Sequence, residues 1–138
     1  MKPAVWLTFI LSATVLIGAQ QKEVKKVPVT PTRADSAVEM FKTYCASCHG
    51  VDGKGHGPAS EALKVPPANL TLLKQKNGGT FPSSRVTRVV EGLDPITAHG
   101  SSDMPTWGPI FHSLEPGNDA IAKLRIANLV KYIASMQQ

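Results

Sequence analysis

The sequence has few of the residues that stabilise a small domain. Aromatic residues make up 6% and charged residues 18% of its 138 positions, and its two cysteines are too few for a disulfide framework. The apolar content of 42% argues against a disordered polyelectrolyte, and 11 glycines with 11 prolines argue against a coiled coil. These features predict a loop-rich domain whose small core needs added stabilisation, for which a bound cofactor is one source.

A nucleic-acid-binding signature is also lacking, because no stripe of basic residues is interleaved with aromatic residues. The formal net charge is +5, but the basic excess lies near the start of the chain. From Ala34 onward the sequence has 10 Lys and Arg against 9 Asp and Glu, so this part is close to neutral. We therefore expect no nucleic acid as a partner.

The first 33 residues indicate export followed by a linker. Lys2 precedes an apolar stretch that ends at Ala19, which predicts a signal peptide over residues 1–19. The alternative is an uncleaved anchor that tethers the protein to a membrane, although the stretch is short for a span. Both interpretations place the domain in the periplasm or another extracytoplasmic space. Residues 20–33, with Pro28 and Pro31, predict a flexible linker before a domain over residues 34–138.

The domain is predicted to be all-α, with three or four short helices and long loops, because no strand-like alternation is present. We expect helices over residues 35–44, capped by Asp35 or Ser36, and over residues 82–91, capped by Ser83 or Ser84 and ended by Gly92. Residues 61–64 predict one short turn, and residues 93–114 predict a loop. The last helix is expected to be capped by Asn118 or Asp119. Its predicted buried stripe contains Ala122, Ile126, Leu129, Ile133 and Met136, whereas Lys123, Arg125 and Lys131 lie off it.

The segment from Cys45 to His49 reads CASCH and matches the C-x-x-C-H pattern of haem c attachment. Two thiols at this spacing reach the two vinyl groups of one porphyrin edge, and the adjacent His49 then binds the iron as an axial ligand. A thioredoxin-like redox pair and a zinc site that includes His56 are alternatives, as is a chance match. A glycine-rich loop follows the motif but no predicted strand precedes it, which makes a phosphate cradle a weak interpretation.

A second axial ligand has to come from elsewhere in the chain. The sulfur and imidazole candidates are Met40, Met104, Met136, His56, His99 and His112. We favour Met104 because it lies in a predicted loop and is followed by Pro105, which restricts the backbone. His99 is the second choice. Core packing is the expected role of Met40 and Met136.

On these residues the chain resembles the class I c-type cytochromes, which are small monohaem electron carriers. The resemblance covers residues 34–136 and rests on a helix with Phe41, the CASCHG motif with its glycine loop, the Met104-Pro105 loop and a final helix with Tyr132. It implies the cytochrome c fold wrapped around one haem c bound through Cys45 and Cys48. It also implies axial ligation by His49 and Met104, and a crossing of the first and last helices near Phe41 and Tyr132. Trp107 is expected to pack beside the haem or within the core.

The resemblance further implies that the protein transfers single electrons between a redox protein donor and an acceptor, and that it is not itself an enzyme. Two alternatives remain at this point. One is a haem c subunit of a larger dehydrogenase or oxidase complex, and the other is a haem sensor or peroxidase with a displaceable ligand.

Overall fold

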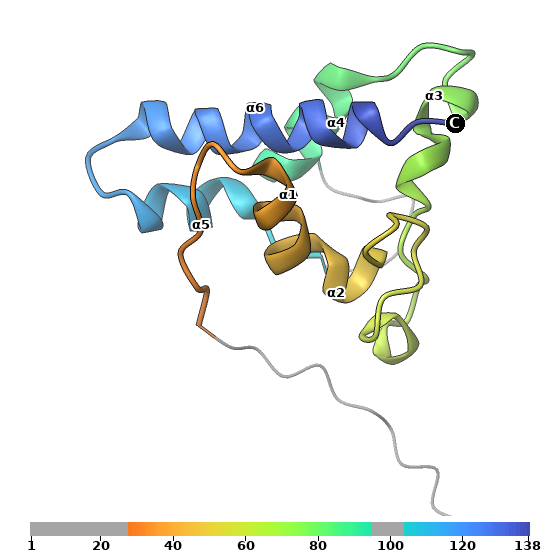
Figure 1. Cartoon of the computed structure of the whole chain (residues 1–138), viewed down its shortest axis with the longest axis horizontal. Helices are drawn as coiled ribbons and strands as arrows, with labels where there is room; N and C mark the ends of the chain where they lie inside the picture. Colours follow the sequence, from red (N-terminus) through yellow and green to blue (C-terminus); the bar gives the residue numbers. More distant parts are fainter. Residues whose placement is uncertain (1–27, 95–103) are drawn as a thin grey trace, which may run out of the picture.

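The computed structural model describes residues 28–94 and 104–138, which form helices and loops without a strand. The long helix α6 (Asp119–Ser135) runs along one side of the domain (Figure 1). It contacts α1 (Ala37–Met40), α4 (Ser83–Glu91) and α5 (Trp107–Leu114), so that the core lies between α6 and these shorter helices. The predicted all-α class is confirmed.

The first helical segment is longer than predicted and changes its pitch. After α1 the chain forms a π-helical turn, Phe41–Cys45, and then α2 (Ala46–His49). The expected end at residue 44 is therefore wrong, because the helix continues through both cysteines and stops at Gly50, where φ is +77°. Single π-helical turns of this kind are often found at functional sites.

Helix α4 occupies the range predicted for it and ends at Gly92, which adopts the left-handed conformation. The predicted serine caps are wrong, because Pro82 is the N-cap residue and Ser83 is already the first helical position. Ser36 is the N-cap residue of α1, but its side chain makes no capping hydrogen bond.

Helix α5 (Trp107–Leu114) corrects the expectation of a loop over residues 93–114. The sequence WGPIFHSL contains Gly108 and Pro109, which ordinarily weaken a helix. Here Pro109 is the third helical residue, where a backbone N–H has no intrahelical acceptor, so proline costs little. Gly108 allows the close approach of α4, since a Cβ at this position would lie 2.6 Å from the carbonyl oxygen of Glu91.

Short elements shape the loop between α2 and α4. They are a 3₁₀ turn at Ser60–Ala62, a second one at Leu70–Leu72, and α3 (Leu73–Lys76). The first of these overlaps in part with the short turn predicted at residues 61–64. The second follows Asn69, whose side chain accepts a hydrogen bond from the backbone N–H of Thr71.

The predicted buried face of α6 is confirmed at four positions and wrong in one respect. Asn118 caps the helix, and the side chains at positions 122, 126, 129 and 133 are buried, while Met136 is half-buried against the core. Arg125, expected off the stripe, is only 2% exposed. Its Nη2 donates to Glu115 at 2.8 Å and its Nη1 donates to Thr32 Oγ1 at 3.2 Å, and these partners are what allow a guanidinium group to lie inside.

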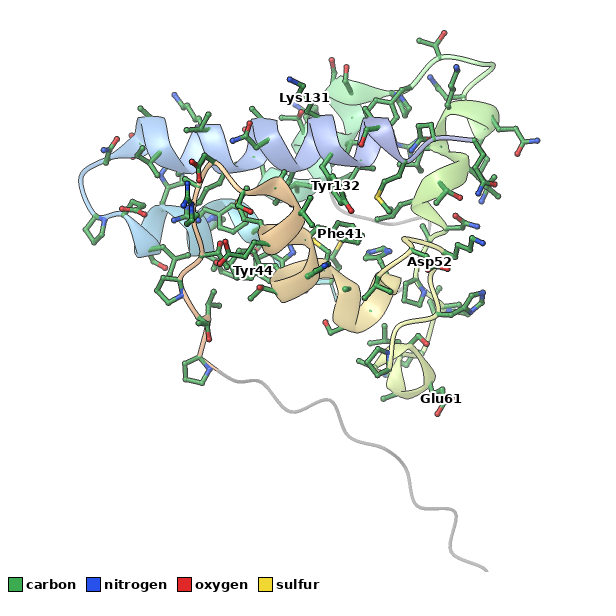
Figure 2. The ribbon with its side chains drawn as sticks, viewed as in Figure 1. Phe41, Tyr44, Asp52, Glu61, Lys131 and Tyr132 are labelled. Atoms are coloured by element: carbon green, nitrogen blue, oxygen red, sulfur yellow. The ribbon has the colours of Figure 1, made fainter. Side chains whose placement is uncertain are left out.

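The crossing of the first helical segment and α6 is held by an aromatic contact. The ring centroids of Phe41 and Tyr132 lie 5.3 Å apart, and Figure 2 shows the two side chains meeting between the helices. Phe41 is completely buried. The contact agrees with the crossing that the family resemblance implied.

The segment before α1 lies against the domain from Val29 onward, within the range expected to be a flexible linker. Tyr44 donates a hydrogen bond to the carbonyl oxygen of Thr30, and its hydroxyl lies 2.9 Å from Thr32 Oγ1. Asn128 on α6 donates to the carbonyl oxygen of Ala34. Residues 1–27 lie outside the described part, and in the part described no helix is long and apolar enough to span a membrane.

We predict that Glu115→Ala destabilises the domain by about 3 kcal/mol, near the lower end of the cost of leaving a buried charge without its partner. Because Glu115 is itself 36% exposed, the loss of stability is expected to be smaller than for a fully buried pair. Arg125 has almost no access to water, so it stays buried without its partner. Urea unfolding of the haem-loaded protein measures the change. The control is Asp35→Ala, which breaks the exposed Arg33–Asp35 pair and is expected to have little effect. Equal stabilities of the two variants would contradict the prediction.

Candidate functional site

The two cysteines lie on consecutive turns of the first helical segment. Cys45 ends the π-helical turn and Cys48 lies within α2, and both residues are partly buried and not disulfide-bonded. Burial, with a smaller contribution from Cys48, raises the pKa of the Cys45 thiol to about 12. Cys45 is therefore a neutral thiol in the chain alone, and it packs against the hydrophobic core.

His49 ends α2 and is oriented by a backbone carbonyl. Its Nδ1 lies 3.0 Å from the carbonyl oxygen of Ala68. Because a carbonyl oxygen only accepts, Nδ1 carries a proton, and in the neutral ring the lone pair is then on Nε2. A histidine held in this way has the tautomer and the ring orientation that metal-ligating histidines ordinarily have.

The glycine loop after His49 (residues 50–57) folds back onto α2. The backbone N–H of Gly55 donates to the carbonyl oxygen of His49 at 2.7 Å, and that of Gly57 donates to Cys48 at 2.9 Å. A Cβ at Gly57 would lie 2.4 Å from the carbonyl oxygen of Ser47, so no larger residue fits there. The loop thus caps the last carbonyl groups of the helix that carries the motif, a structural role that accounts for these two glycines.

The acceptor of the His49 bond was missed in the sequence. Every residue has a backbone carbonyl, and Ala68 has no polar side chain that would mark its position in the sequence. The nearest signal is Asn69, whose short side chain favours caps and turns and which here closes the turn that follows Ala68. Leu70 then donates its backbone N–H to Gly53 at 2.7 Å, which joins this segment to the glycine loop.

Met104 is half-buried and packs against the hydrophobic core, just before α5. Trp107, three residues later, is 7% exposed and belongs to an aromatic cluster with Tyr44 and Phe111. The centroid of Trp107 lies 5.1 Å from that of Tyr44, which directly precedes Cys45. Trp107 therefore packs within the protein core, and its contact with the haem stays a prediction. The aromatic cluster links the start of α5 to the cysteine-bearing helix.

The other described candidates for the second ligand lie at the surface or in the core. His99 lies outside the described residues. His56 is exposed, and Nδ1 of His112 lies 3.0 Å from Asp119 Oδ1 at the surface. The sulfur of Met40 lies in the core, 3.9 Å from Nη1 of Arg125.

Met136 lies against the glycine loop, since a Cβ at Gly53 would meet its methyl group at 2.8 Å. Packing is thus confirmed for Met40 and Met136. Within residues 28–94 and 104–138, no three His, Cys, Asp or Glu side chains are grouped as a zinc site would require.

The residues present fit a covalently held haem. The chain offers two thiols at the required spacing, a histidine next to the second thiol in the ligating tautomer, and a half-buried methionine in front of α5. Neither a curated protein nor a solved structure matches the chain. A family model described as Cytochrome c matches residues 34–137. The chain belongs to the cytochrome c family, whose members bind haem c covalently through a cysteine pair, here Cys45 and Cys48.

Proposed function

We propose that this protein is an exported monohaem electron carrier whose haem iron is ligated by His49 and Met104. Membership of the cytochrome c family implies electron transfer by haem. The observation that carries the finer proposal is the hydrogen bond from His49 Nδ1 to the carbonyl oxygen of Ala68, because it selects the ligating tautomer next to the cysteine pair.

Haem c, when bound, supplies the one-electron chemistry of iron cycling between Fe(III) and Fe(II). The protein residues would hold the haem and set its reduction potential. Cys45 and Cys48 would hold the haem covalently, and the Ala68 carbonyl orients the imidazole of His49, which would bind the iron. Met104 would be the second protein ligand of the iron. With His49 and Met104 both bound to the iron, no iron position would be left for a substrate, so we propose that the isolated chain does not catalyse a reaction.

Partners and location follow from the charge and from the first residues. The domain from Ala34 onward is near neutral. We therefore propose weak electrostatic steering toward its redox donor and acceptor. The apolar stretch before Ala19 supports an extracytoplasmic location, either after cleavage or with the stretch kept as a membrane tether. A fixed haem c subunit of a larger dehydrogenase or oxidase complex is the alternative, and stable co-purification with a larger protein would favour it.

A redox titration combined with carbon monoxide binding tests the proposal. The haem-loaded protein is expected to titrate as a single one-electron couple. Its reduced form is expected to show no spectral change on addition of carbon monoxide at neutral pH, because Met104 occupies the iron. Tight carbon monoxide binding to the unmodified protein would contradict His/Met ligation and favour a sensor or a peroxidase.

A further inference from the structure

The side chain of Gln137, in the short segment after α6, is bonded to three backbone groups. Its Nε2 donates to the carbonyl oxygens of Leu70 at 2.7 Å and Ile133 at 2.8 Å, and its Oε1 accepts from the backbone N–H of Lys74 at 2.8 Å. One of these groups is on α6 itself and the other two are more than sixty residues away in the chain. Figure 1 shows the end of the chain beside α3.

The neighbours of Gln137 contact the same region. The backbone N–H of Gln138 donates to the carbonyl oxygen of Thr71 at 3.1 Å. Met136 lies against Gly53, as described above. Residues 136–138 therefore hold the loop segment 70–74 and the glycine loop at the same time.

The segment that Gln137 holds also contains the acceptor of the His49 bond. Ala68, whose carbonyl oxygen accepts from His49, is two residues before Leu70. Between them, Asn69 accepts from both the backbone N–H and the hydroxyl of Thr71, a residue that is 3% exposed.

The chain on the amino side of Ala68 is also in contact with the glycine loop. A Cβ at Gly55 would lie 2.5 Å from the carbonyl oxygen of Pro67, so the glycine loop contacts the chain directly before Ala68. The position of the Ala68 carbonyl thus depends on contacts on both sides, and those on the far side include Gln137.

We propose that Gln137 is a positioning residue for His49, acting through Leu70 and the Ala68 carbonyl. The inference rests on the proposed ligation of the haem iron by His49. A hydrogen bond from Nδ1 to a carbonyl increases the basicity of a ligating imidazole. A more basic imidazole favours Fe(III), so a well-held Ala68 carbonyl lowers the reduction potential. Loosening the segment raises it.

Gln137→Ala in the haem-loaded full chain tests this role. We expect a higher reduction potential and a His49 Nδ1 proton that exchanges faster by a factor of roughly 3–10, the effect of one or two net hydrogen bonds on local opening. The proton is followed by NMR on protein labelled at histidine nitrogens, at a temperature far below the melting transition. Gln137→Glu is a second, nearly isosteric variant that keeps the acceptor for Lys74 and loses both donations, and it is expected to shift both readouts in the same direction.

The matched control is Gln138→Ala, which removes an exposed glutamine side chain next in sequence and keeps the backbone bond to Thr71. It is expected to change neither readout. A lower melting temperature of the Gln137 variants, with an unchanged potential and unchanged exchange, would show a purely structural role and overturn the inference. If the unmodified protein lacks covalent haem or His49 ligation, the proposed function fails and the inference fails with it. A normal spectrum of the unmodified protein with unaffected Gln137 variants refutes the inference alone.

Discussion

Replacing both cysteines, as Cys45→Ser with Cys48→Ser, is expected to leave a chain without covalent haem and without a cooperative unfolding transition. The reason is the size of the core. The buried apolar residues come mainly from α6 and the first helical segment, and Cys45 itself packs against them. A domain this small buries too little surface to be stable by a wide margin, so loss of the haem removes a large share of its core.

Near-ultraviolet circular dichroism during a thermal scan measures the effect. The control is Ser47→Ala, which changes the motif between the two cysteines and keeps both thiols. It is expected to bind haem and to unfold cooperatively. A native-like cooperative melt of the double serine variant would show that the polypeptide core suffices, and would refute the prediction.

Met104→Ala is expected to open the sixth coordination position and to lower the reduction potential. The thioether of methionine favours the reduced iron relative to nitrogen ligands. Its loss is expected to shift the potential by on the order of 0.1–0.3 V, a part of the roughly 0.8 V over which axial ligands set haem potentials. The reduced variant is expected to bind carbon monoxide, unlike the unmodified protein.

The matched control is Met136→Leu, at the other half-buried methionine that packs against the core. This substitution removes the sulfur and keeps most of the apolar volume, so the potential should change far less than in Met104→Ala. If Met104→Ala has the spectrum and potential of the unmodified protein, Met104 is not the ligand. His99, outside the described residues, would then be the next candidate.

The spacing of apolar residues and the positions of helix-ending residues predicted the helices α4 and α6. The buried face of α6 was predicted correctly because it depends on the spacing of apolar residues along the helix. The end of α4 at Gly92 was predicted correctly because it depends on one left-handed backbone conformation. Helix α5 was missed because Gly108 and Pro109 argue against a helix unless both fall in its first turn and Gly108 lies against α4. That placement depends on the tertiary structure.

Burial of polar groups was equally hard to predict. Arg125 lies inside because Glu115 and Thr32 reach it from two other segments, one of which was expected to be a linker. The chemistry of the site was visible wherever side chains carry it, at Cys45, Cys48 and His49. The orienting carbonyl of Ala68 was not, because any residue supplies that group.

The most direct measurement of the central claim is an optical spectrum of the oxidised and reduced protein after co-expression with a haem c maturation system. The account predicts sharp low-spin c-type bands that stay with the polypeptide on denaturation, together with the weak sulfur-to-iron band of the ferric state. A folded protein without colour would contradict the binding of covalent haem and would favour thiol or zinc chemistry for the cysteine pair. A covalent c-type spectrum without the sulfur band would contradict the assignment of Met104.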